Sequence, residues 1–193
     1  MVSRQYCLAM SDHDISAMIG RLARIVSHDG HAAGLKPVQW EALRYLARAN
    51  RFSCTPSALT AYLGTTKGTV SQTLMALERA GFVRKSTDPA DRRSVRLELT
   101  EAALALLPHD ETQRFERAMD AISELERRAL RLGLSALLKA RITADGGRPF
   151  GLCHACRHFR KDARGPGRHL CGLLAEPLDD DDASRICVEQ EAA

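Results

Sequence analysis

The stretch TPSALTAYLGTTKGTVSQTLMALERAGFVRKSTDPADRRSVRLELT, residues 55–100, decides the fold. It opens with a short helix that has clear ends. Thr55 can cap this helix, Pro56 suits its first position and Gly64 can end it. A second helix follows at once, with Thr66 as its cap. Because the turn between them is so short, the two helices must cross steeply, which predicts a helix-turn-helix unit.

The second helix has an apolar face and a polar face. Val70, Leu74 and Leu77 recur at helical spacing and predict a buried stripe. A small and polar outward face is what a helix needs in order to enter the major groove of DNA. The positions expected to face outward are Lys67, Gly68, Ser71, Gln72 and Met75.

After Gly81 the apolar pattern changes from a helical period to alternation. Residues 82–86 and 94–99 alternate as strands do, and a loop rich in turn formers and charge separates them. Two helices followed by such a hairpin predict a winged helix-turn-helix. We therefore expect a mainly α fold with an α+β wing.

The rest of the chain up to about residue 143 reads as helix. Pro108 predicts a kink in one helix, and Ser123 with Glu126 forms a capping box at the start of the last one. The expected helical segments are residues 12–27, 35–49, 100–122 and 124–143.

Residues 10–143 resemble the MarR family of bacterial transcription regulators. The strongest signature is the wing DPADRRSVRLELT, residues 88–100. The resemblance implies an obligate homodimer in which the first and the last two helices interleave into a dimerisation layer. It also implies that two winged lobes reach successive major grooves of a pseudo-palindromic operator in double-stranded DNA.

The resemblance assigns roles to individual residues. It makes residues 66–80 the recognition helix, Arg93 the wing-tip arginine that enters the minor groove, and Asp91 the acid that braces the wing. Many relatives carry arginine where this chain has Gln72. Glutamine pairs best with adenine and arginine with guanine, so we expect a different operator sequence.

Physical chemistry supports further DNA contacts. Lys67 and Arg92 are expected to neutralise phosphates, which makes the affinity salt-dependent. The hydroxyls expected to reach phosphates or base edges are those of Thr66, Thr69 and Thr73.

Composition bounds the function class. The formal net charge is +4, a mild excess that permits nucleic-acid binding. No apolar run approaches membrane-helix length, so we expect no membrane partner and a cytoplasmic location. No nucleophile–base set, P-loop or dinucleotide motif is visible, so an enzyme is not expected. Many MarR-like proteins bind a phenolic ligand between their layers, so a small-molecule effector stays open.

The end of the chain carries four cysteines in the pattern C-x2-C-x14-C-x15-C, at Cys153, Cys156, Cys171 and Cys187. Four thiolates complete a tetrahedral zinc site or an iron–sulfur cluster. The segment ADGGRP predicts a boundary between a domain of residues 1–145 and a module of residues 146–193. A module this short cannot bury enough apolar surface to fold alone, and the binding of a metal supplies the missing folding energy.

The spacing favours a 4Fe–4S cluster over Zn²⁺. Zinc ribbons usually show two C-x2-C pairs, whereas a single pair followed by two isolated cysteines resembles small modules of the high-potential iron–sulfur type. Disordered free thiols, reversible disulfides and a histidine replacing one cysteine remain alternatives. The candidate histidines are His154, His158 and His169, and Cys7 and Cys54 are expected to be structural thiols.

The combined prediction is a dimeric regulator that responds to redox, oxygen or metal state. The module follows the last dimerisation helix, so we expect it to bias the spacing of the two DNA-reading helices. The main alternative is a regulator that responds to a phenolic ligand and carries a structural zinc. Less favoured are a thiol–disulfide oxidoreductase and an adaptor that binds a protein through its tail. The acidic run at residues 179–182 is expected to be a solvated loop.

Overall fold

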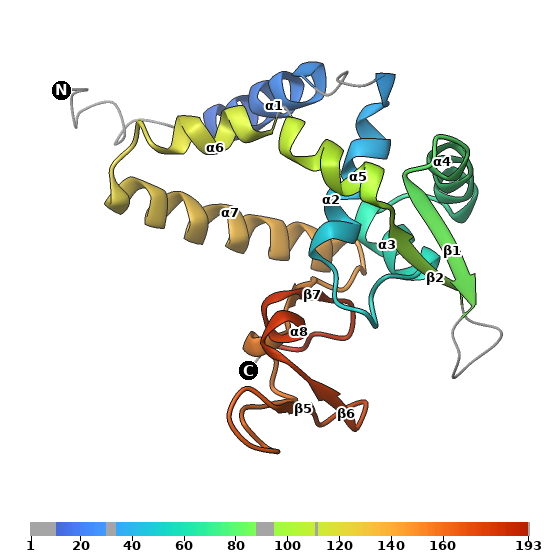
Figure 1. Cartoon of the computed structure of the whole chain (residues 1–193). Coiled ribbons are helices and arrows are strands. Elements are labelled where there is room, and N and C mark those ends of the chain that lie inside the picture. Colours follow the sequence, from blue (N-terminus) through green and yellow to red (C-terminus); the bar gives the residue numbers. More distant parts are fainter. Residues whose placement is uncertain (1–10, 30–33, 88–94, 111, 193) are drawn as a thin grey trace.

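The structure is a computed structural model that describes residues 11–29, 34–87, 95–110 and 112–192. Figure 1 shows three parts: a winged lobe, a helical arm that extends away from it, and a small tail beside the lobe. The winged lobe comprises α2 (Pro37–Arg48), α3 (Pro56–Leu63), α4 (Lys67–Arg79), β1 (Val83–Thr87) and β2 (Val95–Leu99). The arm comprises α1 (Asp12–Asp29), α5 (Glu101–Leu106), η2 (Leu107–His109), α6 (Gln113–Met119) and α7 (Glu124–Ala144).

The helix-turn-helix forms where the sequence predicts it. The Thr55 side chain accepts a hydrogen bond from the backbone N–H of Ala58 at 3.2 Å, which satisfies one free donor at the start of α3. Gly64 ends α3 in the left-handed region, with φ of 58°. Thr66 caps α4 by accepting from the backbone N–H of Thr69 at 3.2 Å.

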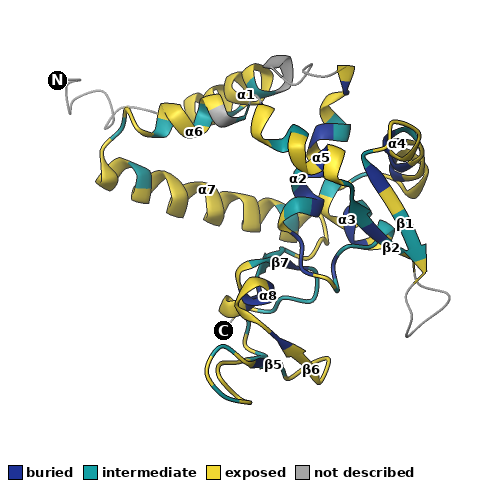
Figure 2. Cartoon of the chain, viewed as in Figure 1, coloured by how far each residue is buried: buried dark blue, intermediate teal, exposed yellow. Residues whose placement is uncertain are grey.

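One hydrophobic core holds the winged lobe together. The predicted stripe of α4 is buried, with Val70, Leu74 and Leu77 at most 2% exposed. This stripe packs with buried residues of α2, α3 and β2, including Trp40, Leu43, Tyr45, Leu59 and Leu97. The recognition helix is therefore fixed on one side and leaves its other side to solvent (Figure 2).

The wing is an antiparallel hairpin rooted in the lobe. Val83 pairs with Leu99 and Thr87 with Val95. The backbone N–H of Leu97 also donates to the carbonyl of Cys54 at 2.8 Å, which ties β2 to the turn between α2 and α3. Residues 88–94, the connection between the two strands, lie outside the described residues.

The arm exposes its helices along their length. In the single chain every residue of the 21-residue helix α7 is at least partly exposed, and the same holds for residues 12–26 of α1. The predicted capping box begins α7, because Ser123 Oγ accepts from Glu126 N–H and Ser123 N–H donates to Glu126 Oε2. No described helix is long and apolar enough to span a membrane.

Pro108 lies where the helix ends, whereas the sequence predicted only a kink in a continuous helix. The helix ends at Leu106, a short 3-10 turn follows over residues 107–109, and α6 starts anew at Gln113. Proline has no backbone N–H to donate to the preceding turn, and here this loss ends the helix.

A buried ion pair fixes this break to the winged lobe. Arg44 on α2 makes two hydrogen bonds to the Asp110 carboxylate, at 2.5 and 2.7 Å, and the Asp110 side chain is 8% exposed. Burial opposes ionisation of Asp110, but hydrogen bonds from Arg44 and Thr112 together outweigh it and lower its pKa.

We expect Asp110→Asn to lower the free energy of unfolding by about 2 kcal/mol, because it leaves a half-buried guanidinium without its charge partner. Since the folded-state pKa of Asp110 is lowered, its contribution is present above the unfolded pKa of about 3.9 and is lost as pH falls through the folded value. Denaturant unfolding at several pH values measures both effects. Glu98→Gln is the control, because its partner Arg84 is largely exposed and such pairs contribute less than about 1 kcal/mol. Equal losses in the two variants would contradict the assignment.

The tail folds into two small antiparallel sheets and a short helix. Strands β3 (Gly151–Leu152) and β7 (Ile186–Cys187) form one sheet, and β4 (Phe159–Arg160), β5 (His169–Cys171) and β6 (Glu176–Leu178) form the other. The remaining elements are η3 (Cys153–Ala155) and α8 (Asp180–Ser184).

The tail packs against the winged lobe. Ile186 is 6% exposed and belongs to the core of the winged lobe, and its carbonyl accepts from the backbone N–H of Asn50 at 2.8 Å. Arg51 forms an ion pair of 2.6 Å with the buried Asp182. The predicted module of residues 146–193 thus packs on the turn between α2 and α3.

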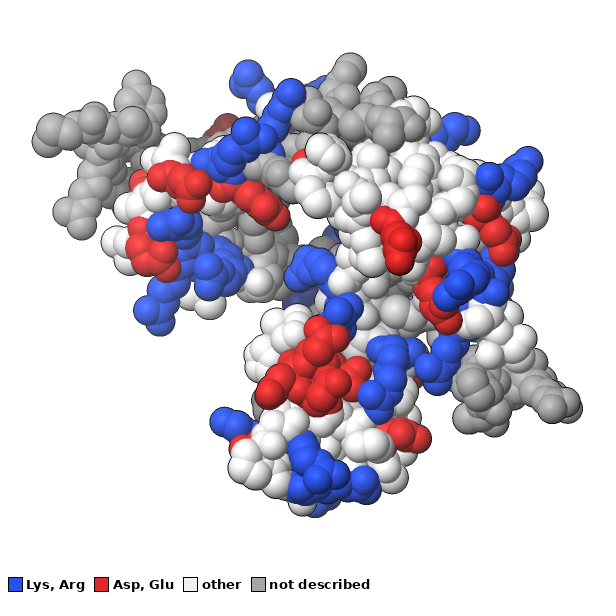
Figure 3. All heavy atoms as spheres, in the orientation of Figure 1, with Lys and Arg blue, Asp and Glu red and all other residues white. Residues whose placement is uncertain are grey.

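The acidic run is not a solvated loop, contrary to the sequence-based expectation. Asp179 caps α8 by accepting from the backbone N–H of Asp182 at 2.7 Å. Carboxylates favour a helix start because the free N–H groups there carry partial positive charge. Figure 3 shows the acidic side chains gathered over α8, with basic side chains on either side.

Candidate DNA-binding surface and cysteine cluster

The first turns of α4 present a small, polar surface. Lys67, Gly68, Ser71 and Gln72 are exposed, as is Met75 further along. Thr66 and Thr69 are exposed beside them, with their hydroxyls 3.0 Å apart. Apart from Lys67, whose charge favours a phosphate, the exposed side chains in the first turn of α4 are small, so a nucleic-acid backbone can approach it closely.

Thr73 is wrongly placed among the DNA contacts by the sequence-based prediction. It is 6% exposed, and its hydroxyl donates to the carbonyl of Thr69 at 2.9 Å. The reason is helical geometry, since Thr73 lies three residues after Val70 and four before Leu77 and so shares their buried face. Its role is packing.

The predicted wing-tip residues Asp91, Arg92 and Arg93 lie outside the described residues. The described root of the wing is held by Glu98, which accepts from Arg84 at 2.6 Å and from Ser86 at 2.8 Å. These two hydrogen bonds lower the pKa of Glu98. Lys85 forms an ion pair of 2.8 Å with Glu78 of α4, which braces β1 against the recognition helix.

Residues 33–94 match the model of the MarR family. This match covers about a third of the chain, and the winged lobe has the winged helix-turn-helix fold of the solved structures that it resembles. A MarR regulator from Methanosarcina mazei Go1 shares the fold at 24% identity and a TM-score of 0.58, over 69% of this chain and 99% of that one. The S. aureus MepR–DNA complex does so at 21% identity and a TM-score of 0.54, over 65% and 96%. A probable transcriptional regulator from Pseudomonas aeruginosa matches at 25% identity and a TM-score of 0.52, over 65% and 98%.

The matched proteins have a described role, and each match covers only part of this chain. Two of these proteins are described as transcriptional regulators, and the third, MepR, is seen in complex with DNA. None of the curated proteins matches the chain. The three solved structures are matched almost end to end but leave about a third of this chain uncovered.

Three of the four tail cysteines, Cys153, Cys171 and Cys187, pack into one small apolar cluster. Cys153 and Cys187 are buried, at 5% and 6% exposed, and pack with Leu178. Cys171 is half-buried against the same cluster, and Cys156 lies one turn after Cys153. Burial, together with the nearby sulfurs of Cys187, Cys171 and Cys156, raises the pKa of Cys153 to about 12. A thiolate at this position therefore needs a cation beside it.

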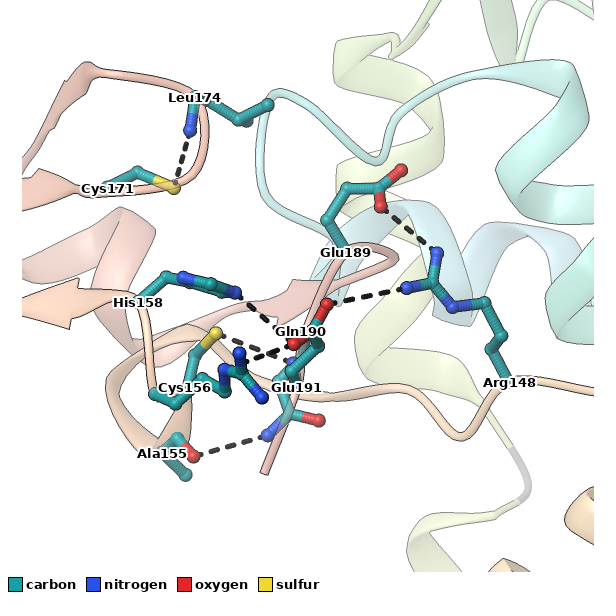
Figure 4. Close-up of polar contacts among 10 residues, drawn as sticks. Arg148, Ala155, Cys156, His158, Cys171, Leu174, Glu189, Gln190 and Glu191 are labelled. Carbon is teal, nitrogen blue, oxygen red and sulfur yellow. Dashed lines mark hydrogen bonds and ion pairs between the residues drawn. The ribbon is translucent and has the colours of Figure 1, made fainter. Parts of the chain in front are cut away.

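Backbone N–H groups point at the sulfurs. Figure 4 shows the N–H of Glu191 donating to Cys156 Sγ at 3.4 Å and the N–H of Leu174 donating to Cys171 Sγ at 3.5 Å. The Glu191 segment is itself held, because the Glu191 carboxylate contacts Arg157 at 3.2 Å and His158 at 3.3 Å. Such hydrogen bonds stabilise negative charge on sulfur and tune metal-bound thiolates.

The three tail histidines have other partners. His169 is buried, its Nδ1 accepts from the backbone N–H of Asp162, and its Nε2 faces Asp180 at 3.0 Å. His154 Nδ1 donates to the carbonyl of Ala183 at 3.0 Å, while His158 contacts Glu191. His169 thus has no nitrogen left for a metal, and the other two serve as structural contacts.

The sulfurs are not gathered as a site for one ion. Among the described residues, no three or more Cys, His, Asp or Glu side chains form a group that could hold a single metal ion. The five described cysteines, Cys54 included, are free thiols, and Cys7 lies outside the described residues.

Two residues of the winged lobe belong to this cysteine cluster and were missed by sequence reasoning. Asn50 and Ser53, both 0% exposed, lie in the turn between α2 and α3 next to Cys187. The Ser53 hydroxyl accepts from the backbone N–H of Val188 at 2.9 Å. No local pattern marks these residues, because their partners lie more than a hundred positions further along the chain.

Proposed function

We propose that the chain is a dimeric, sequence-specific DNA-binding transcription regulator whose tail carries a cysteine-bound 4Fe–4S cluster responsive to redox or oxygen. The observation that carries the DNA-binding proposal is the polar surface at the start of α4, fixed over a buried stripe in a MarR-family lobe. A helix presented in this way suits the major groove.

The expected contacts divide by chemistry. Lys67 neutralises a phosphate, and Gln72 reads a base edge, with adenine as its best partner. Arg92 and Arg93 of the wing add a phosphate contact and a minor-groove contact. None of these groups carries out a reaction, which agrees with a binding function.

Dimerisation is supported by apolar side chains on the arm. The exposed ones on α1 lie at helical spacing, and a stripe on α7 does the same. A soluble helix with such a face is stabilised mainly by packing, so both helices call for a partner surface. The occupant we propose is a second copy of the chain, which would place two winged lobes on one operator. The side chains are Ile15, Met18, Leu22 and Ile25 on α1, and Leu130, Leu134 and Leu137 on α7.

We expect two α4 variants to separate phosphate binding from base reading. Lys67→Ala should weaken binding to all sequences alike and reduce the slope of log affinity against log salt by about 1. Gln72→Ala should lose about 1–3 kcal/mol on the preferred operator and relax preference at one position of each half-site. Fluorescence anisotropy with selected and scrambled duplexes measures both.

Arg79→Ala is the matched control, because Arg79 is exposed at the far end of the same helix and its Nε donates to the carbonyl of Met75. An Arg79 variant as impaired as the Lys67 variant would contradict the proposed docking of the helix start.

Three observations support a cysteine-bound cluster. A single C-x2-C pair is followed by two isolated cysteines, three of the four cysteines share one apolar cluster, and backbone N–H groups donate to the sulfurs of Cys156 and Cys171. Cys153, Cys156, Cys171 and Cys187 would bind the irons, one each. When bound, the cluster supplies one-electron redox chemistry, while the protein holds the sulfurs, excludes water from Cys153 and Cys187, and donates hydrogen bonds. A structural Zn²⁺ with a phenolic effector in the helical layer is the second candidate, and metal analysis decides between them.

A further inference from the structure

The Asn50 side chain is a buried amide with an unusual environment. Asn50 is 0% exposed, and its Nδ2 has no hydrogen-bond partner that meets ordinary geometry. A buried donor left unpaired loses its hydrogen bonds to water without replacement, so its position calls for an explanation.

The orientation of this amide is fixed by its neighbours. Asn50 Oδ1 accepts from the backbone N–H of Ser53 at 3.1 Å, and the Asn50 backbone N–H donates to the carbonyl of Ile186 at 2.8 Å. With the oxygen end held by Ser53, the NH₂ end is directed to the Cys187 side of the turn. The neighbours of Cys187 on either side are both bound to this turn, because Ile186 accepts from the Asn50 backbone and the Val188 N–H donates to the Ser53 hydroxyl at 2.9 Å. The buried Cys187 side chain therefore lies against the turn.

The acceptor beside this amide changes strength with its chemical state. A thiol sulfur is a weak acceptor, whereas a metal-bound thiolate carries negative charge and accepts strongly. Donors of this kind around a metal ligand tune the centre and hold the ligand in place.

We propose that Asn50 is a positioning residue of the metal centre, supplied by the winged lobe, whose Nδ2 donates to the metal-bound Cys187 sulfur. This inference rests on the proposed cysteine-bound centre. Ser53 assists, because its hydroxyl accepts from Val188 N–H while reaching the same sulfur.

Asn50 lies in the turn that joins the proposed metal centre to the helix-turn-helix and the wing. Three residues after it, Ser53 accepts from the Tyr45 hydroxyl at 2.8 Å through its carbonyl. The next carbonyl, that of Cys54, accepts from Leu97 of the wing, and Thr55 caps α3. We expect a change of charge at Cys187 to act on the start of α3 and the root of β2 through this turn. This route adds to the expected bias on the spacing of the two DNA-reading helices.

The test compares Asn50→Asp with wild type by redox titration of the holoprotein under anaerobic conditions. Aspartate keeps the shape and the acceptor for Ser53 N–H but replaces the donor with a carboxylate oxygen. Without the donor, the reduced centre loses stabilisation. We expect a tenfold lower ratio of reduced to oxidised cluster at a given potential, which is about 59 mV for a one-electron couple. Ser57→Ala is the control, because it removes an exposed hydroxyl on α3 that lies 3.1 Å from the Thr55 hydroxyl, and its potential should match wild type.

A cluster-loaded Asn50→Asp protein with the wild-type potential overturns the proposal. If Asn50→Asp does not fold, Ser53→Ala gives the same test, with a smaller shift in the same direction expected. If the wild-type protein holds zinc, the readout becomes the rate of zinc release to a chelator, where Asn50→Asp should be at least tenfold faster and an unchanged rate contradicts the assignment. A wild-type protein without bound metal instead overturns the proposed function itself, which metal analysis shows before any variant is made.

Discussion

Cys187→Ser is expected to lose the bound iron and the visible absorption, and to loosen the tail from the winged lobe. The Cys187 sulfur is buried and touches both the apolar cluster of the tail and the turn that holds Asn50 and Ser53. A serine hydroxyl is a poor ligand for iron, and a module this small depends on its metal for folding. Iron analysis measures the first effect, and limited proteolysis after residue 145 measures the second.

Cys54→Ser is the matched control for this experiment. Cys54 is half-buried, its sulfur contacts the carbonyl of Ala49 at 3.8 Å, and it lies outside the four-cysteine set. The Cys54→Ser protein should keep its iron. A Cys187→Ser protein that retains full iron, or a Cys54→Ser protein that loses it, would refute the ligand assignment.

The second large effect is expected from a charge placed on the apolar stripe of α7. Leu134→Glu should convert the dimer to a monomer and weaken operator binding by about 100-fold or more. The reason is that two linked lobes bind DNA with an effective concentration that single lobes lack. Sedimentation and anisotropy measure the two effects on the same sample.

Ser135→Glu introduces the same charge one residue later, on the side of α7 where Arg131 and Lys139 lie. It should leave the dimer and the affinity unchanged. A dimeric Leu134→Glu protein with wild-type affinity would show that the exposed stripe serves another partner.

Local signals explain why much of the fold was predictable. Thr55, Gly64 and Ser123 act on the backbone within a few residues, so their capping roles follow from the sequence and agree with the structure. The prediction of a DNA contact for Thr73 does not agree with its burial. The spacing could have revealed this, since Thr73 lies between Val70 and Leu77 on the buried face of α4. Pro108 was identified as a break, but whether a proline kinks or ends a helix depends on tertiary packing such as the Arg44–Asp110 pair.

The docking of the tail could not be predicted in this way. Ile186 joins a core built mainly from residues before position 108, and Arg51 pairs with Asp182 far along the chain. The acidic run reads as a solvated loop in isolation, and only the fold shows that Asp182 is buried beside Arg51. The four cysteines were evident from their spacing, whereas Asn50 and Ser53 became visible only through contacts.

The cysteine-bound cluster is tested by purifying the full chain without oxygen and recording its visible absorption and metal content. We expect a brown protein with a broad band near about 400 nm from thiolate-to-iron charge transfer, and several irons per chain. A colourless protein with one zinc per chain would contradict it.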